Sequence, residues 1–417
     1  MRRESRGERV AQMKPKDFGK NLGVRQEKES QACGLTGFIN EDGTAVSGEI
    51  IWRSICNMRE RGNGLGGGFA GYGIYPDYRE CYAFHLMYDG ERCREQAEEM
   101  LSQRFEIEKD EPIPVDRIPE LVEHTTEPIL RRYFLRPREI PLDGSEDEES
   151  ARDAEAEYVI KAVMDINLHV DGAYVFSSGK NMGAFKAVGH AEYVGLYYKI
   201  YEYKGYMWIA HDRFPTNTQA WWGGAHPFTL LDWAVVHNGE ISSYGINKRY
   251  LEEHGYYCTL FTDTEVMAYL MDLLVRRHKL PVEVACDVIA PPFWRRIDRM
   301  PAERRELYRA IRAIYGSAEV NGPFAVIIGS TGRLIGFNDR IKLRPMVCAR
   351  KGDTLYVASE EAAIREICDA PDIVWTQPAG SPAIGQLKNG AAKVAGEPEW
   401  AERPAEQPAP AGGSAGG

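Results

Sequence analysis

The sequence predicts an α+β fold in which short strands and a few helices pack as layers. Short apolar runs recur along the chain, as expected for buried strands. A small number of helices with clear start signals lie between them. The 417 residues are 43% hydrophobic and 27% charged, the composition of an ordinary globular protein. Such strands and helices are stabilised by packing in layers around a shared core.

The two ends of the chain differ in composition from the middle. Residues 1–32 are polar and hold nine Lys/Arg and five Asp/Glu, a local charge of +4. We expect these residues to form a mobile leader. Residues 396–417 are rich in Pro, Ala and Gly and are expected to form a disordered tail. Residues 33–395 therefore contain the folded domain.

The folded part is expected to begin with a strand and a helix. Residues 33–40 read as a short apolar strand that ends in the turn Glu41-Asp42-Gly43. Ser47 has the position of an N-cap before an amphipathic helix that ends near Gly62. Residues 69–87 are aromatic and strand-like.

The remaining elements alternate less regularly. Residues 91–170 are expected to be more helical and charged, and the acidic run 143–149 to be a solvated loop. Thr262 and Glu265 have capping-box spacing and predict a helix through His278. Further strands are expected at residues 206–210, 233–236, 324–328, 334–337 and 355–358.

Composition excludes several classes of function. A net charge of -11 argues against nonspecific nucleic-acid binding. No window approaches ~18 consecutive apolar residues, and residues 1–32 lack the apolar core of a secretory signal. We therefore expect a cytoplasmic protein with no membrane partner. The eight cysteines form no C-x-x-C pair and no H-E-x-x-H occurs, so no metal site is expected.

Four separate segments suggest a shared chemistry. Cys33 offers a thiol that can attack an amide carbonyl. Arg213 follows a predicted strand and can bind a carboxylate with two hydrogen bonds. Asn238 and Gly239 can direct two N–H groups at an oxyanion. Asp263 can hold an ammonium group. Together the four segments match free glutamine.

Each segment alone has a simpler structural interpretation, which we would prefer for each in isolation. Cys33-Gly34 could be packing or a turn, and Asn238-Gly239 could be a turn. Asp263 could be a helix cap, and Arg213 could form a surface ion pair. The order and local sequence of all four segments favour the chemical interpretation.

These motifs resemble the class II, N-terminal-nucleophile glutamine amidotransferases, and most closely the stand-alone glutaminase subunit of archaeal-type glutamate synthases. The resemblance extends from Cys33 to about residue 390, with a helical, charged insertion at about 90–195. Its most specific parts are His211-Asp-Arg-Phe-Pro-Thr-Asn-Thr218, Ala225-His-Pro227, His237-Asn-Gly-Glu-Ile241, Asp263-Thr-Glu265, Asp339-Arg-Ile-Lys-Leu-Arg-Pro345 and Ala358-Ser-Glu360.

The resemblance implies a four-layer αββα sandwich of the N-terminal-nucleophile hydrolase type, and it implies a role for each site residue. Cys33 would attack the glutamine amide, and Asn238 and Gly239 would form the oxyanion hole. Arg213 would bind the glutamine carboxylate and Asp263 its amino group. The matched segments add Thr216 and His226 to the substrate-binding residues.

In this family the base is the α-amino group of the N-terminal cysteine, whose unperturbed pKa is about 7.7–8.0. His211, His226 and His237 are therefore expected to be structural. Cys33 is internal in this sequence, and its nitrogen is an amide. The mechanism thus predicts cleavage between Ala32 and Cys33.

Two further motifs have alternative interpretations. Residues 62–67 satisfy G-x-G-x-x-G, but a helix is expected before them and a strand after them, the reverse of a dinucleotide site. A close-packed loop beside the glutamine pocket is the better interpretation. Trp221-Trp222 could be a lid over that pocket or core packing, with a weak preference for the lid.

The resemblance predicts L-glutamine as substrate and ammonia delivery to a glutamate synthase catalytic subunit. No cofactor is expected in this chain, and FMN and iron–sulfur clusters are expected only on the partner. Two alternatives remain open. An unprocessed chain would be a catalytically silent scaffold, and a processed one could serve another acceptor, as in N-methylglutamate synthesis.

Overall fold

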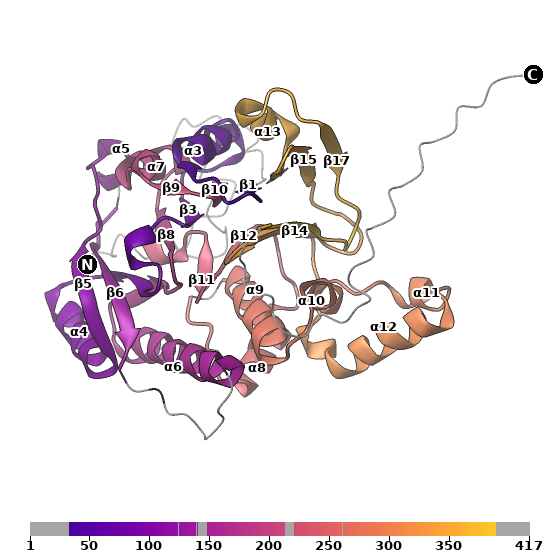
Figure 1. Cartoon of the computed structure of the whole chain (residues 1–417), viewed down its shortest axis with the longest axis horizontal. Coiled ribbons are helices and arrows are strands. Elements are labelled where there is room, and N and C mark those ends of the chain that lie inside the picture. The colour runs from indigo at the N-terminus through magenta and orange to yellow at the C-terminus, as the bar shows by residue number, and fades with distance from the viewer. Residues whose placement is uncertain are drawn as a thin grey trace, which may run out of the picture.

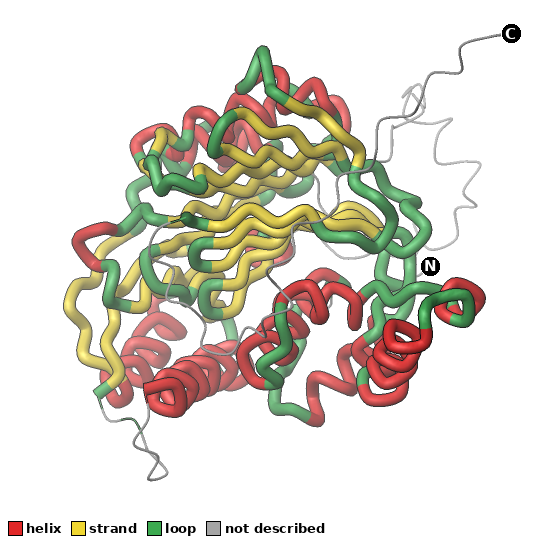
Figure 2. Tube along the Cα trace, turned by 45° about the vertical axis from the view of Figure 1, so that its right-hand side comes forward, coloured by secondary structure: helices red, strands yellow, loops and turns green. Residues whose placement is uncertain are grey.

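The computed structural model describes residues 33–123, 125–138, 140, 148–212, 221–260 and 262–388. Two antiparallel sheets pack face to face, and helices cover both outer faces (Figure 1). The same four layers are visible from a second direction in Figure 2. The αββα sandwich expected from the resemblance is therefore confirmed. The leader 1–32 and the tail 396–417 lie outside the described residues.

The first sheet has seven strands in the order β17-β15-β16-β1-β10-β3-β8. Strand β1 lies in its middle, between β10 and β16, so the segment after Cys33 is anchored on both sides. The strands are β1 (Gly34–Asn40), β3 (Gly67–Tyr72), β8 (Met182–Ala187), β10 (Met207–Asp212), β15 (Val347–Lys351), β16 (Thr354–Ala358) and β17 (Ile373–Thr376).

The second sheet has five strands in the order β11-β12-β13-β14-β18. Alternate residues of the two sheets form the core between them: Leu35 and Ile39 of β1 meet Val236 and Ile327, whereas Phe38 faces the opposite side. The strands are β11 (Phe228–Leu230), β12 (Trp233–Gly239), β13 (Phe324–Ser330), β14 (Arg333–Asn338) and β18 (Ala383–Gln386).

Helices complete the outer layers. Apolar residues of α3, α7 and α13 share a core with the outer face of the seven-stranded sheet, whereas those of α8, α9 and α10 share one with the five-stranded sheet. The helices are α3 (Glu49–Cys56), α7 (Ala191–Tyr197), α13 (Glu361–Ile367), α8 (Tyr244–Glu253), α9 (Thr264–Met271), α10 (Val282–Ile289), α11 (Trp294–Ile297) and α12 (Ala302–Ile314). A small ribbon joins β2 (Val46–Ser47) to β9 (Lys204–Gly205).

A third sheet extends the sandwich with a βαββαβ unit, which we call the side module. Its strand order β5-β6-β4-β7 is that of the ferredoxin-like or split βαβ motif. One face of this sheet packs on helices α4 and α6. The other face packs toward β8 and α7. The elements are β4 (Tyr82–Tyr88), α4 (Glu91–Arg104), β5 (Phe105–Pro112), α5 (Pro119–Val122), β6 (Ile129–Pro137), α6 (Glu148–His169) and β7 (Ala173–Ser177).

The side module corrects the expected character of residues 91–170. Helices α4 and α6 agree with that expectation, but β5 and β6 were not predicted. Both strands are rich in charged residues, which form ion pairs between the two strands, such as Arg132–Glu111 and Arg136–Glu108. The acidic run is partly helical, because Glu148 and Glu149 begin α6, and residues 143–147 lie outside the described residues.

Several predicted boundaries also change. Ser47 lies in β2 and Gly48 is the N-cap of α3, although the Ser47 Oγ still accepts the Glu49 N–H at 3.1 Å. That helix ends at Cys56, and residues 59–61 form a separate 3₁₀ turn before Gly62.

The predicted capping box at Thr262 is wrong. The Glu265 carboxylate turns back to accept the N–H groups of Thr259 and Leu260, and α9 begins after Asp263. The helix continues beyond Met271 as a π-helical segment, Asp272–Arg277. The five later strands predicted from residue 206 onward are confirmed as parts of β10, β12, β13, β14 and β16.

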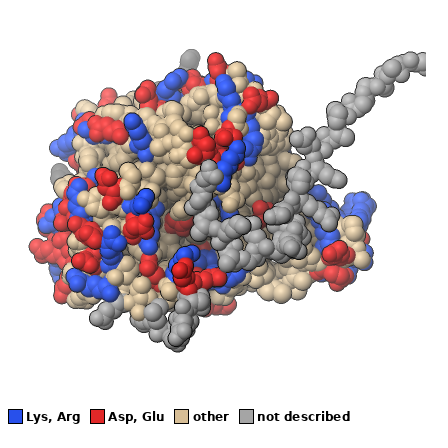
Figure 3. All heavy atoms as spheres, in the orientation of Figure 1, with Lys and Arg blue, Asp and Glu red and all other residues tan. Residues whose placement is uncertain are grey.

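The face of the molecule shown in Figure 3 carries charges of both signs. Acidic and basic side chains are interspersed over most of the face shown in Figure 3. In the described part of the chain, every helix is too short or too polar to cross a bilayer.

Candidate active site

Four elements of secondary structure begin or end at one edge of the sandwich. Cys33 directly precedes β1, and Gly34 pairs with Asp212 at the end of β10. Strand β12 ends at Gly239, and α9 begins after Asp263. A hydrogen bond of 3.3 Å from Asn238 Nδ2 to the Cys33 carbonyl oxygen joins the two sheets at this edge. The fold thus brings three of the four predicted segments together. Arg213, which directly follows Asp212, and Thr216 lie outside the described residues.

The backbone of Cys33 is held from two sides. Its carbonyl oxygen accepts hydrogen bonds from Asn238 Nδ2 and from Arg61 Nε, the latter at 3.1 Å. The Arg61 guanidinium also forms an ion pair with Glu360, which fixes its position. Arg61 was not among the predicted site residues; its only sequence signal was its place directly before Gly62, in the turn after the first helix.

Strand β1 is also fixed by the segment that precedes Glu360. The Leu35 N–H donates to Ser359 Oγ at 3.2 Å, and the Ser359 N–H donates to the Leu35 carbonyl at 2.9 Å. The position of Cys33 is therefore set by backbone pairing and by two side chains from distant parts of the chain. Such constraint is what a reacting sulfur needs to reach a bound amide repeatedly.

The pair Asn238-Gly239 ends β12 in a conformation that only glycine accommodates. Gly239 has φ of +139°, and a Cβ atom there would lie 1.8 Å from the Pro323 carbonyl oxygen. Asn238 is 1% exposed and lies in register with Ala325 of β13. The sharp turn and the close approach of β13 keep both N–H donors at the edge that holds Cys33.

Replacing Gly239 by alanine is expected to lower the free energy of unfolding by about 2 kcal/mol or more, because both the φ value and the Pro323 carbonyl oppose a Cβ. Chemical denaturation measures this change. Gly255→Ala is the matched control, since Gly255 has φ of +82° but a Cβ added there would meet no atom within 4 Å. Equal losses in the two variants would show that the contact with Pro323 relaxes freely.

Asp263 supports the turn that follows the predicted oxyanion residues. Its Oδ2 accepts the Ile241 N–H at 2.7 Å, and its Oδ1 lies 3.3 Å from Thr264 Oγ1 and 3.8 Å from His237 Nδ1. It occupies the N-cap position of α9 but makes no capping hydrogen bond with its side chain. The carboxylate is 18% exposed, so it remains open at the edge of the site. A cap alone does not account for this geometry.

Three histidines form a buried polar cluster beneath Asp263. Thr264 Oγ1 lies 3.0 Å from His226 Nε2 and 2.9 Å from His237 Nδ1. The rings of His211 and His226 stack at 3.9 Å, and His211 Nε2 lies 3.1 Å from the His237 carbonyl oxygen. Burial lowers the pKa of His226 and of His237, so both rings are neutral near pH 7. Thr264, which the sequence analysis did not single out, connects this cluster to the site edge.

The glycine-rich loop at residues 62–67 packs against the end of β10. A Cβ on Gly62 would lie 2.6 Å from the Asp212 carboxylate, and one on Gly64 would lie 2.9 Å from His190 Nε2. Asp212 accepts hydrogen bonds from His190 Nδ1 at 3.2 Å and from the Ala191 N–H at 3.3 Å. Strand β3 follows the loop directly, where a dinucleotide site would require a helix.

Trp221 and Trp222 lie beside the side module. Trp222 is buried, donates from Nε1 to Thr125 Oγ1 at 3.1 Å and packs on Tyr197. Trp221 is 39% exposed and lies edge-on to Tyr174. Both indoles line a cavity beside the side module, so the lid interpretation is wrong for Trp222, which is a packing residue.

Within the described ranges, no three His, Cys, Asp or Glu side chains are grouped closely enough to hold a metal ion. The groups that the structure does bring to this edge are the thiol of Cys33, the amide donors of Asn238 and Gly239, and the carboxylate of Asp263.

Comparison with known proteins identifies the family. The family described as glutamine amidotransferases class-II matches residues 108–374, which include Asn238, Gly239 and Asp263 but begin after Cys33. An uncharacterized protein of Archaeoglobus fulgidus is 50% identical over 369 residues, which cover 88% of this chain and 95% of that protein.

Two further comparisons are more distant. A provisionally named glutamine amidotransferase of Methanothermobacter thermautotrophicus is 24% identical over 83% of this chain and 97% of its own length. The solved structure of glutamine phosphoribosylpyrophosphate amidotransferase from B. subtilis aligns with 86% of this chain and 50% of that chain, at 14% identity and a TM-score of 0.39. The family match spans well over half of the sequence, and the chain belongs to the class II glutamine amidotransferases.

Proposed function

We propose that this chain is the glutaminase subunit of a glutamate-synthase-type complex, which hydrolyses L-glutamine and passes ammonia to a separate synthase subunit. Membership of the family implies glutamine as substrate and an ammonia acceptor in general. The observation that carries the proposal is the convergence of Cys33, Asn238 and Asp263 at one edge of the sandwich. The resemblance of the Gly-Asn-Gly-Leu-Gly-Gly-Gly-Phe segment, residues 62–69, to the stand-alone glutaminase subunit of archaeal-type glutamate synthases favours this acceptor.

Free glutamine offers three groups that these residues can recognise. Its α-ammonium group suits the open carboxylate of Asp263, and its carboxylate suits the guanidinium of Arg213. Its side-chain amide would then lie at the Cys33 sulfur, next to the donors of Asn238 and Gly239. Thr216 and His226 would complete the pocket, His226 through its contact with Thr264.

The reaction would proceed through a thioester. The free α-amino group of Cys33 accepts the thiol proton, and the sulfur attacks the amide carbon. N–H groups of Asn238 and Gly239 stabilise the resulting oxyanion. The amino group returns its proton to the leaving nitrogen, ammonia departs, and water then hydrolyses the thioester to glutamate. Burial lowers the pKa of His226 and of His237, which makes both rings weak proton acceptors and so supports an amine as the base.

This mechanism requires that residues 1–32 are removed. Cleavage between Ala32 and Cys33 would convert an amide nitrogen into an amine. The FMN and iron–sulfur clusters of glutamate synthesis would belong to the partner subunit. N-methylglutamate synthesis is an alternative acceptor reaction that uses the same glutaminase step.

The state of the N-terminus tests the mechanism. Intact-mass measurement of active protein is expected to show a chain that begins at Cys33, and ammonia and glutamate should be released in equal amounts. Full-length protein with undiminished glutaminase activity would overturn the amine mechanism.

A glutamine-like diazo-ketone is expected to label Cys33. Failure of the processed chain to react would favour the scaffold alternative.

A further inference from the structure

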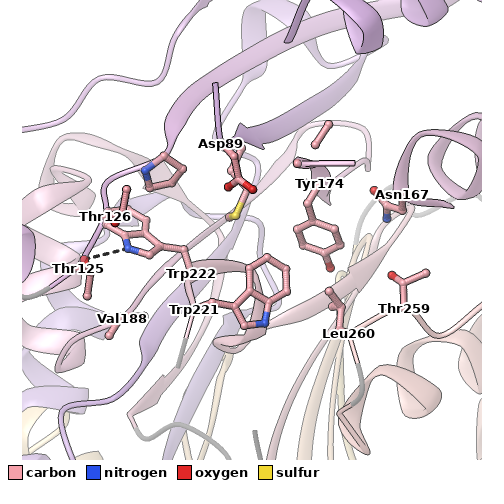
Figure 4. A pocket seen from close by; sticks show the side chains of 14 residues that line it. Asp89, Thr125, Thr126, Asn167, Tyr174, Val188, Trp221, Trp222, Thr259 and Leu260 are labelled. Atoms are coloured by element: carbon pink, nitrogen blue, oxygen red, sulfur yellow. Dashed lines mark hydrogen bonds between the residues drawn. The ribbon is translucent and has the colours of Figure 1, made fainter. Parts of the chain in front are cut away.

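A cavity of about 530 Å³ lies between the side module and the sandwich (Figure 4). The end of β4, the loop before β6 and the start of β7 form one wall, and the segments around Trp221 and Leu260 form the other. Its volume is that of a site for a small organic molecule. Of the residues assigned to glutamine, none that the structure describes lines it.

Aromatic rings and one carboxylate dominate this cavity. The Asp89 carboxylate and the rings of Tyr174 and Trp221 lie around a common space (Figure 4). The centroids of the Tyr174 and Trp221 rings are 5.7 Å apart. Trp222 is held in place by its hydrogen bond to Thr125. These rings are therefore preorganised as faces against which a ligand can pack.

Asp89 is the only side chain with a formal charge among the described residues that line the cavity. Its backbone is fixed, because its N–H donates to the Gly172 carbonyl oxygen at 2.8 Å. Asp89 itself is exposed to solvent. A carboxylate beside the Trp221 ring attracts an organic cation, both by charge and by cation–π interaction, whereas the Tyr174 ring already has the Lys186 ammonium 5.2 Å from its centroid.

Neutral hydrogen-bonding groups extend the site. The Asn167 Oδ1 accepts the Val175 N–H at 2.8 Å, which directs its amide group and leaves the Nδ2 hydrogens for other partners. No Lys or Arg stands among the lining residues that the structure describes, so this wall offers nothing to balance a ligand carboxylate or phosphate. The composition of the wall thus favours an amine or guanidinium compound with a short polar or apolar body.

Two buried charged side chains link this cavity to the Cys33 edge. The Glu265 carboxylate accepts the N–H groups of Thr259 and Leu260 in the cavity wall, and Glu265 lies in the first turn of α9, directly after Asp263 and Thr264. A shift of the wall at Leu260 would therefore be transmitted to the start of this helix.

The second link runs through Lys186. Its Nζ donates to the Gly223 carbonyl oxygen at 2.7 Å and to the Pro227 carbonyl oxygen at 3.2 Å. Gly223 directly follows the cavity residue Trp222, and Pro227 directly follows His226, which contacts Thr264. The wall formed by the segments around Trp221 and Leu260 is thus connected at two points by hydrogen bonds to the residues around Asp263.

We infer that this cavity is an effector site for a small organic cation, held by Asp89, Tyr174 and Trp221, and that its occupancy changes the affinity of the glutamine site. The effect on glutamine rests on the proposed function, whereas the binding of the cation does not. Coupling between two sites typically amounts to roughly 5–150-fold in affinity.

Binding is tested first, on the full chain without glutamine. The probes are n-butylammonium and n-butylguanidinium, with n-butanol and butyrate as neutral and anionic analogues of the same length. Tryptophan fluorescence and calorimetry should detect the two cations and not the two analogues. Asp89→Asn should weaken cation binding about tenfold, the value of one charge-assisted contact. Trp221→Leu should both weaken binding and reduce the fluorescence response.

Asp369→Asn is the matched control for the charge change. Asp369 is 95% exposed and lies beside β17, at the opposite edge of the seven-stranded sheet from β8. This variant should bind the cations as the unaltered chain does. Equal binding of the neutral and cationic probes, or unchanged binding by Asp89→Asn, would overturn the assignment.

Coupling is tested second, by measuring the KM for glutamine at saturating probe. A change of about fivefold or more is expected in the unaltered chain and none in Asp89→Asn. Cation binding with an unchanged KM would refute the effector role. If the chain hydrolyses no glutamine at all, the proposed function fails, and the binding experiment alone decides whether the cation site exists.

Discussion

Replacing Cys33 by alanine is expected to abolish glutamine hydrolysis, with turnover reduced by roughly 10⁴–10⁶-fold. The variant loses the attacking sulfur, so no thioester can form and water would have to attack the amide directly. The carbonyl oxygen of residue 33 would still be held by Arg61 and Asn238, because both contacts are to the backbone. We therefore expect normal folding and normal glutamine binding, measured by calorimetry beside a steady-state glutaminase assay.

Cys56→Ala is the matched control for this experiment. Cys56 ends α3, and burial raises the pKa of its thiol to about 12, so it is protonated and unreactive near pH 7. Its removal should leave turnover unchanged. Residual activity of Cys33→Ala close to that of the unaltered chain would show that another group is the nucleophile, and it would remove the chemical role assigned to this edge of the sandwich.

Replacing Asn238 by alanine is expected to reduce kcat by roughly 10²–10³-fold, the effect of losing one oxyanion donor. The side chain contributes an N–H that is held near Cys33 in the structure, at 3.3 Å from its carbonyl oxygen. Because the oxyanion develops only during the reaction, the loss should fall on kcat more than on KM. Steady-state kinetics on the processed enzyme separates the two parameters.

Asn247→Ala provides a comparison with a buried asparagine of structural function. Asn247 donates to the carbonyl oxygens of Ser317 and Glu319 at 2.8 and 3.0 Å, away from the Cys33 edge. Its loss should lower the free energy of unfolding by about 1–3 kcal/mol and leave kcat unchanged. An Asn238→Ala variant with the same pattern, destabilised but fully active, would show that Asn238 positions Cys33 and does not stabilise the oxyanion.

Local sequence signals located many strands of the sandwich, whereas its four-layer αββα arrangement was implied only by the family resemblance. Apolar runs located β1, β10, β12, β13, β14 and β16, because buried strands must carry apolar side chains whatever lies beside them. The strands β15, β17 and β18 and the side-module strands β5, β6 and β7 were not predicted. Strands β5 and β6 carry many charged residues, and such a composition predicts a solvated segment unless the cross-strand partners are known.

Helix starts were less predictable than strands. Thr262 and Glu265 have the spacing of a capping box, yet Glu265 binds the backbone of Thr259 and Leu260. A buried carboxylate is stabilised by whichever N–H groups the tertiary structure leaves unpaired, and the sequence does not reveal which groups those are.

The sequence by itself determined the kinds of chemical group available: a thiol at Cys33, amide donors at Asn238 and Gly239, and a carboxylate at Asp263. It also determined that each lies where a strand or helix begins or ends. Only the tertiary structure decided which of these ends meet, because contacts between residues far apart in the chain, such as Cys33 and Asn238, depend on sheet order and register. The hydrogen bond from Arg61 to the Cys33 carbonyl oxygen and the cavity beside Asp89 both arise from that packing. No local sequence pattern predicts either of them.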